Sequence, residues 1–199
     1  MARPNRFSRE ELVDAAISIA AGAGPAGLTM TAVAAAADAP TGSLYHRFAS
    51  RDELLAEAWI RAMGSFQEGF LQALAVDTRP PGLAASLFPI EWARGNLSAA
   101  RILVLHRRQE FMAGEIPAPL RETAATQASD LDRAIAGFAL SAWGNSGLAA
   151  KDRALFLTLD LPNAAMRRYL AAGITPPVSV DALVAEAVSA LSTAAGRPD

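Results

Sequence analysis

The sequence predicts an all-α protein, and three of its features lead to that prediction. Hydrophobic residues make up 52% of the 199 residues, and much of this fraction is alanine, the best helix former and a poor strand former. Apolar residues recur at steps of three and four along most of the chain, as they do on one face of a helix. Runs of β-branched and aromatic residues, which would indicate strands, are scarce.

The first predicted helix begins at a capping box and ends in a glycine-rich segment. Ser8 is followed three residues later by Glu11, so each is placed to cap the other's backbone N–H. Leu12, Ala16 and Ile19 then follow at helical spacing. A cluster of glycine and proline over residues 22–27 ends the helix.

Two short helices and a tight turn follow, over residues 29–48. Thr29 is a plausible N-cap for a helix over 29–36, and Asp38 lies where the turn needs a left-handed residue, which aspartate tolerates. A third helix is expected over 40–48. Gly42 inside it costs about 1 kcal/mol against alanine, which predicts close approach by a DNA strand or by a neighbouring helix. Such an arrangement is typical of a helix-turn-helix.

A long fourth helix is predicted from a second capping box, formed by Ser50 and Glu53. Its apolar stripe extends over about five turns and consists of Leu55, Trp59, Met63, Phe66, Phe70 and Leu74. Residues 77–82 are the clearest linker. The remaining predicted helices cover residues 83–94, 97–112, 120–142, 150–159 and 180–195. Pro89 interrupts the first of these, and the helix over 150–159 is kinked or restarted at Pro162.

The residues of the turn and of its flanking helices resemble the N-terminal signature of the tetracycline-repressor (TetR) family. The resemblance rests on residues 29–34, 40–48 and 50–55 and covers about residues 6–66. Two positions depart from the family pattern: Asp38 replaces the usual turn glycine, and Pro40 replaces a frequent serine or threonine. The resemblance implies a DNA-binding domain over 6–66, with the helix-turn-helix at 29–48, and a helical ligand-binding and dimerisation domain over 67–199.

The resemblance also implies roles for individual residues. Tyr45 and Thr41 would contact phosphates, and His46 on the recognition helix would approach base edges. Arg51 would hold a phosphate at the start of the fourth helix, where the helix dipole favours an anion. The expected DNA-binding residues are Thr29, Thr31, Thr41, Gly42, Ser43, Tyr45, His46 and Arg51. Three alternatives stay open: Tyr45 caps the core, His46 contacts nothing, and Arg51 is a solvated charge.

A regulator of this kind needs an effector site, and the helices between residues 83 and 143 are the expected walls. Their bulky side chains suit an apolar or aromatic ligand fixed by few polar groups. The expected lining residues are Phe88, Trp92, Leu103, His106, Arg107, Phe111, Phe138 and Trp143. The alternatives are that the aromatic residues fill the core, and that the polar run from His106 to Glu110 forms interhelical ion pairs.

The last predicted helix has a wide apolar surface with small alanines, which predicts a homodimer. One domain face cannot cover all of it, so we expect this helix and the one ending near Leu159 or Leu170 to form a four-helix interface with their copies in a second subunit. The expected interface residues are Leu183, Val184, Ala187, Val188 and Leu191.

Charge and composition exclude several other classes of protein. The formal net charge is −2, so DNA contact must come from a few well-placed groups. With no cysteines and two histidines, neither a disulfide framework nor a common transition-metal site is expected, nor is any cofactor. The absence of an apolar stretch of about 18 residues and of a signal peptide predicts a cytoplasmic protein without membrane contact.

Catalysis has weak support in the sequence. Residues 144–147 resemble part of a nucleophile elbow, but Leu148 stands where the second glycine belongs and no strand precedes it. The expected function is therefore not enzymatic. It is a transcriptional regulator, a repressor that binds a palindromic operator in double-stranded DNA as a homodimer and is released by a small-molecule effector. The alternative is a helical effector-binding protein with altered or lost operator binding.

Overall fold

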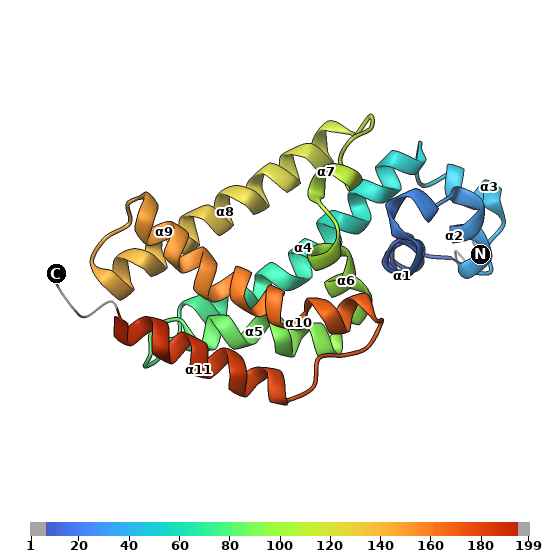
Figure 1. Ribbon diagram of the computed structural model, residues 1–199. Coiled ribbons are helices and arrows are strands. Elements are labelled where there is room, and N and C mark those ends of the chain that lie inside the picture. Colours follow the sequence, from blue (N-terminus) through green and yellow to red (C-terminus); the bar gives the residue numbers. More distant parts are fainter. Residues whose placement is uncertain (1–6, 195–199) are drawn as a thin grey trace, which may run out of the picture. The chain divides into compact units, whose positions relative to one another are not determined.

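The computed structural model describes residues 7–194, and regular secondary structure in that range is entirely helical (Figure 1). This confirms the predicted all-α fold. The helices are α1 (Arg9–Gly27), α2 (Met30–Ala36), α3 (Thr41–Tyr45), α4 (Arg51–Leu74), α5 (Leu83–Gly95), α6 (Leu97–Leu105), α7 (Arg108–Phe111), α8 (Ala118–Trp143), α9 (Leu148–Leu155), the π-helix η1 (Phe156–Asp160), α10 (Leu161–Ala171) and α11 (Ser179–Ala194).

Contacts divide the described chain into two compact units. The first unit comprises residues 7–63 and 98–124, and the second comprises residues 64–97 and 125–194. Helix α4 therefore starts in the first unit and ends in the second, close to the boundary expected after residue 66. Helices α6 and α7 group with the N-terminal helices, although the sequence analysis assigned them to the C-terminal domain.

The first unit is built on one apolar core to which all of its short helices contribute. Leu12 of α1, Leu44 of α3 and Leu54 of α4 are completely buried. Phe111 of α7 packs on Trp59 of α4, with 5.1 Å between ring centroids. Burial of such side chains is the main favourable contribution to folding. Helix α3 joins this core through one side only, that of Leu44.

The first predicted capping box is confirmed, and the second forms in part. The Ser8 hydroxyl accepts from the Glu11 N–H at 3.1 Å, and the Glu11 carboxylate accepts from the Ser8 N–H at 2.7 Å. At the start of α4, the Ser50 hydroxyl accepts from the Glu53 N–H at 3.1 Å. The Glu53 carboxylate reaches back to the N–H of Ala49, one residue before the expected partner, at 2.7 Å.

Helix α1 breaks near its C-terminal end, and two arginines from other helices hold the break. Gly24 has a φ of 72°, which glycine adopts without penalty, and Pro25 has no N–H to donate to the Ala21 carbonyl four residues earlier. Arg101 of α6 supplies that carbonyl with a donor, Nε, at 2.9 Å. Arg51 of α4 donates to the carbonyls of Pro25 and Leu28. The end of α1 is therefore fixed from both α4 and α6.

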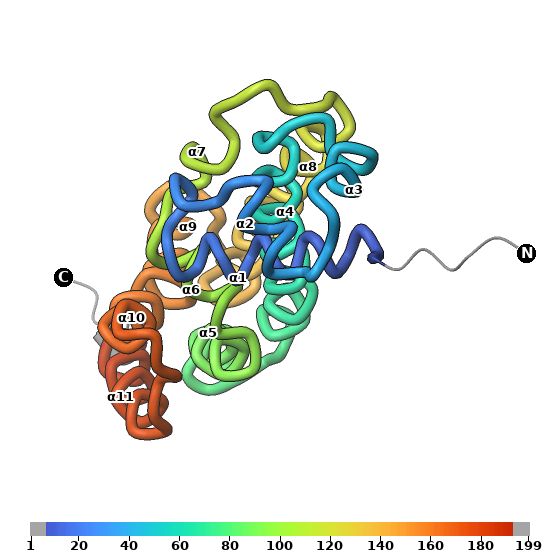
Figure 2. Tube along the Cα trace, turned by 90° about the vertical axis from the view of Figure 1, so that its right-hand side faces the viewer, coloured from blue at the N-terminus to red at the C-terminus, as the bar shows by residue number. Residues whose placement is uncertain are grey.

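In the second unit, α5, α10 and α11 lie side by side (Figures 1 and 2). Along the whole described chain, several predicted boundaries are wrong, beginning with the third helix, which was expected over 40–48 and ends at Tyr45. Helix α5 continues through Pro89, which is buried. The helix expected over 97–112 is interrupted at His106–Arg107 and forms α6 and α7. The chain stays helical from α9 to α10 through the π-helix η1, and Pro162 lies in the first turn of α10, where its missing N–H costs little.

Candidate nucleic-acid interface

The turn between α2 and α3 is held by local hydrogen bonds. The Thr29 hydroxyl caps α2 by accepting from the Ala32 N–H at 3.1 Å. The Ala39 N–H donates to the Ala34 carbonyl at 2.8 Å and closes the turn. Asp38 has a φ of 50°, which confirms the predicted left-handed residue. These bonds fix the path of the chain from α2 into α3.

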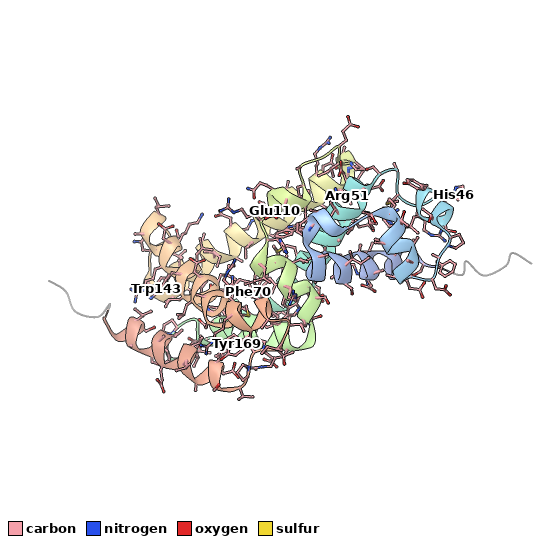
Figure 3. All side chains as sticks on the ribbon, turned by 45° about the vertical axis from the view of Figure 1, so that its right-hand side comes forward. His46, Arg51, Phe70, Glu110, Trp143 and Tyr169 are labelled. Carbon is pink, nitrogen blue, oxygen red and sulfur yellow. The ribbon has the colours of Figure 1, made fainter. Side chains whose placement is uncertain are left out.

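Helix α3 presents a short polar surface to solvent. Leu44 and, just after the helix, Phe48 are completely buried. On the opposite side Tyr45 is 58% exposed, which excludes the alternative that its ring caps the core. His46 is also exposed and lies at the outer edge of this segment in Figure 3. Hydroxyl and imidazole groups of this kind suit phosphate and base-edge contacts.

Gly42 and the threonines of α2 complete this surface. A Cβ at Gly42 would meet no atom within 4 Å. Of the two reasons expected for this glycine, close approach by a neighbouring helix is therefore excluded, and close approach by a DNA strand remains. Thr29 and Thr31 are exposed, while Thr41 and Ser43 are half-buried. The hydroxyl of Thr29 accepts from the backbone and keeps its own proton free to donate.

Arg51 lies at the start of α4 but is engaged within the protein. Its Nε donates to the Leu28 carbonyl at 2.6 Å, and a terminal nitrogen donates to the Pro25 carbonyl. The alternative of a solvated charge is therefore wrong. The phosphate contact expected for Arg51 stays a prediction and would have to use donors left over from these bonds. The sequence could not reveal this role, because both acceptors lie more than twenty residues away.

The charges around the unit are unevenly distributed. An open groove of about 550 Å³ beside α1 and the turn is lined by three carboxylates, those of Glu11, Asp14 and Asp38, and by no basic residue from the part of the chain that the structure describes. This groove would repel phosphate. Arg9 donates to both Glu53 and Glu57, and the hydrogen bond to the Glu57 carboxylate contributes most to raising the pKa of the Arg9 guanidinium. The exposed side of α3 is therefore the surface best suited to DNA.

Comparison with known proteins agrees with this geometry. The family model for bacterial regulatory proteins of the tetR family matches residues 12–58, which contain the whole helix-turn-helix. The chain carries the DNA-binding domain of the TetR family. No match was found among curated proteins.

Solved structures of similar fold cover nearly the whole chain. The fatty acid degradation regulator FadR from Bacillus halodurans has a TM-score of 0.68 at 15% identity over 96% of each chain. The regulator FadR from Bacillus subtilis, in complex with stearoyl-CoA, has a TM-score of 0.66 at 15% identity, over 93% of this chain and 97% of that one. A putative tetR family regulator from Shewanella sp. PV-4 has a TM-score of 0.62 at 19% identity, over 97% and 98%. At these identities the likeness establishes the fold.

The residues expected to line an effector site fall into both units of the regulator. Four belong to the first unit: Leu103, His106, Arg107 and Phe111. Phe111 is 1% exposed and packs in the core of that unit. His106 lies edge-on to Phe111, and its Nδ1 is 3.5 Å from the Glu110 carboxylate. Arg107 is exposed, just before α7. This contact is local, between residues four apart, and it pairs two charges only when His106 is protonated, so the expected interhelical ion pairs stay a prediction.

The other four expected lining residues belong to two aromatic groups of the second unit. Phe88 and Trp92 of α5 pack against Phe66 of α4, with ring centroids 5.8 and 5.2 Å away. Phe138 and Trp143 of α8 contact each other at 5.6 Å. A cavity of about 390 Å³ lies beside Phe138 and is lined by Leu74, Ala75, Val76, Asp77, Thr78, Arg79, Pro81, Gly82, Phe138, Ser141 and Ala142.

The sequence analysis missed Gln67, a buried polar residue of α4. Its side chain is 6% exposed, and Nε2 donates to the Gln127 carbonyl of α8 at 2.9 Å. Because that carbonyl can only accept, the amide orientation is fixed. The other amide atom, Oε1, is buried without a hydrogen-bond partner among the described residues. A glutamine beside the apolar stripe of α4 was the available signal.

Two apolar stripes run along α11, and only one of them is exposed. Val180, Val184 and Val188 are buried and face the interior of the second unit; α11 packs chiefly on α5. Leu183 is 59% exposed and Leu191 40%, with half-buried Ala187 between them. The expected interface role of Val184 and Val188 is therefore corrected: both belong to the core of one protomer, because α5 covers their side of the helix.

Over residues 7–194, no helix is both long and apolar enough to cross a membrane. The same residues contain no cluster of three or more side chains from His, Asp and Glu that could hold a metal ion.

Proposed function

We propose that this TetR-family regulator is a cytoplasmic repressor that binds a palindromic operator as a homodimer and is released by a small apolar or aromatic ligand. The observation that carries the proposal is the polar, solvent-facing side of α3, with open space at Gly42 and with Leu44 anchored in the core. One such helix reads only a few base pairs. Two copies about 34–36 Å apart, or a multiple of that spacing, read a palindrome.

In the proposed complex, the hydroxyls of Tyr45 and Thr41 bind phosphates on one strand, and Thr29 and Thr31 bind the other. Ser43 and His46 meet base edges in the major groove, and Gly42 allows the backbone of α3 to approach the DNA. Arg51 adds a phosphate contact at the start of α4. Phosphate contacts fix the register of the protein, and base contacts give the sequence preference.

The homodimer would form through the exposed stripe of α11, whose members are Leu183, Ala187 and Leu191. Ile174 and Val178, in the segment before α11, are 54% and 74% exposed and extend the same apolar surface along the chain. Exposed apolar groups that recur at helical spacing are characteristic of helix–helix interfaces between subunits.

The effector would bind in the second unit, next to the aromatic side chains of Phe88, Trp92 and Phe138. Gln67 provides a buried carbonyl oxygen that lacks a donor among residues 7–194, and a buried acceptor in that state costs about 1–3 kcal/mol. A ligand that is mostly apolar and donates one hydrogen bond would remove that cost. Stearoyl-CoA, bound by a regulator of the same fold, is one compound to test beside aromatic ones.

Selection of bound sequences from random duplex DNA, at two salt concentrations, tests the proposal. The expected result is a palindrome, with affinity that falls steeply as salt rises. The alternative function, an effector-binding protein without an operator, predicts that ligands change the fluorescence of Trp92 and Trp143 while no sequence is recovered. Replacing Trp59 with phenylalanine removes the signal of the first unit, so that a titration reports only these two tryptophans.

Tyr45→Phe tests the DNA contacts directly. The variant should lose about 0.5–1.5 kcal/mol of operator binding, the usual value of one hydrogen bond, without a change in stability, because the Tyr45 ring is exposed. Tyr169→Phe in the second unit is the matched control and should bind like the parent. Equal affinities for the parent and the Tyr45 variant would exclude a phosphate contact by that hydroxyl.

A further inference from the structure

The recognition helix α3 cannot hold its own orientation. It has five residues, whereas isolated helices shorter than about 12 residues are marginal in water. Its N-cap, Pro40, makes no side-chain capping bond. Neighbouring groups must therefore set the angle at which α3 presents its polar side.

Arg9, in the first turn of α1, contacts the chain just after α3. Its guanidinium carbon lies 4.2 Å from the ring centroid of Phe48, the buried residue that anchors the end of this segment. One terminal nitrogen donates to the main-chain carbonyl of Arg47. A single side chain from α1 thus meets both residues that follow the exposed His46.

The remaining donors of Arg9 bind two carboxylates of α4. Nε donates to the two carboxylate oxygens of Glu57 at 2.8 and 3.0 Å, and the second terminal nitrogen donates to Glu53 at 2.9 Å. Glu53 in turn accepts from the Ala49 N–H at 2.7 Å. Residues 47–49 are therefore held to α1 and to α4 at once, through a network that Arg9 connects.

We propose that Arg9 is a positioning residue for DNA recognition: it fixes the orientation of α3 and does not itself contact DNA. The inference rests on the proposed operator binding. A guanidinium suits this role because it presents five donors in a planar fork, whereas lysine offers three from one point. All three nitrogens of Arg9 already have acceptors within the unit, so the side chain is committed there although it is 38% exposed.

Arg61 is a matched control. It also joins α4 to α1, because its terminal nitrogens donate to the Glu10 carbonyl at 3.1 Å and to Asp14 at 3.2 Å. Its side chain is 39% exposed, almost the same as that of Arg9. Neither of these partners belongs to α3 or to residues 47–49. Arg9→Lys and Arg61→Lys therefore both weaken the α1–α4 contact, but only the first removes the connection to α3.

The test measures binding of the full-length variants to the selected operator and to a scrambled duplex over a series of salt concentrations. Arg9→Lys should reduce the operator-to-scrambled affinity ratio about tenfold, because base contacts need the correct helix angle and non-specific phosphate contacts do not. The slope of log affinity against log salt should stay unchanged. Arg61→Lys should leave the ratio within about twofold of the parent. Glu57→Gln, a milder change in the same network, should lower the ratio in the same direction by less.

Three results would overturn the proposal. A salt slope reduced by about one would mean that Arg9 neutralises a phosphate. Equal losses of affinity for the operator and the scrambled duplex, or equal losses for the two lysine variants, would mean a general loss of stability. Amide hydrogen exchange without DNA decides independently of operator binding: residues 43–49 should exchange faster in Arg9→Lys and not in Arg61→Lys. Unchanged exchange there would contradict the positioning role, whereas a parent that binds no DNA would contradict only the proposed function.

Discussion

The two units fix their helices by different means. In the first unit α2 and α3 have seven and five residues, and arginines from other helices donate to backbone carbonyls beside them or at the end of α1. In the second unit α5, α10 and α11 have 13, 11 and 16 residues and pack mainly through apolar stripes and aromatic groups, with Arg94 of α5 donating to the carbonyls of Pro176 and Pro177 just before α11. Hydrogen bonds are directional and apolar packing is not. The short helices of the first unit therefore depend on such directional bonds more than the longer helices of the second.

The largest effect should come from removing the anchor of α3. Phe48→Ala deletes a completely buried ring and should cost about 3–5 kcal/mol, measured by urea unfolding followed by circular dichroism. The Arg9 contact would be lost with it. The control is Phe156→Ala in the second unit, where the ring is 47% exposed; we expect a loss below about 1 kcal/mol. Similar losses for both variants would contradict the view that burial of Phe48 fixes this segment.

The two stripes of α11 should separate stability from assembly. Val188→Glu places a carboxylate in the core of the second unit and should cost about 4 kcal/mol, because an unpaired buried charge is among the most destabilising changes. Leu183→Glu, on the exposed stripe, should leave the unfolding free energy within about 0.5 kcal/mol and convert the dimer to a monomer in sedimentation. A dimeric Leu183→Glu protein would place the interface on another surface.

The features that the sequence predicted correctly are those determined by neighbouring residues. Ser8 and Glu11 form their capping box, and Asp38 adopts its left-handed conformation, because both depend on residues within one turn. What the sequence did not predict depends on distant partners. Arg51 reaches carbonyls 23 and 26 residues away, and α11 shows two equivalent apolar stripes until α5 covers one of them. The short helix α3 was predictable for the first reason, and the exposed stripe of α11 was only partly so for the second.

Arg101→Met should have an intermediate effect and tests the directional bonds of the first unit. The variant keeps the aliphatic part of the side chain but removes the donor to the Ala21 carbonyl, which Pro25 cannot replace. We expect a loss of about 1–2 kcal/mol in urea unfolding. Arg108→Met, on the exposed side of α7, should change stability by less than about 0.5 kcal/mol. If the two variants were equally stable, the end of α1 would not depend on α6.

The smallest effect should come from Gln67→Leu in the second unit, and there the sign matters more than the size. The variant loses the hydrogen bond from Nε2 to the Gln127 carbonyl, worth about 0.5–1.5 kcal/mol, but it also removes the buried Oε1 that has no partner among the described residues. The two contributions should nearly cancel. We therefore expect the free energy of unfolding, measured by thermal denaturation, to exceed that of the parent by less than about 1 kcal/mol. Gln72→Leu, on the exposed side of the same helix, controls for helix propensity.

A ligand that donates a hydrogen bond to Gln67 Oε1 would make the parent more stable than the Gln67→Leu variant. The parent would then gain stability by mass action, while the leucine variant would gain less, because it offers no acceptor. Thermal unfolding of the parent and of Gln67→Leu, with and without each compound that quenches Trp92 fluorescence, measures the stability of the free and of the bound protein. If Gln67→Leu cost more than about 2 kcal/mol without ligand, Oε1 would already be satisfied, as by a buried water. Gln67 would then help to fix the helices of the second unit, as Arg94 does, instead of offering an acceptor to a ligand.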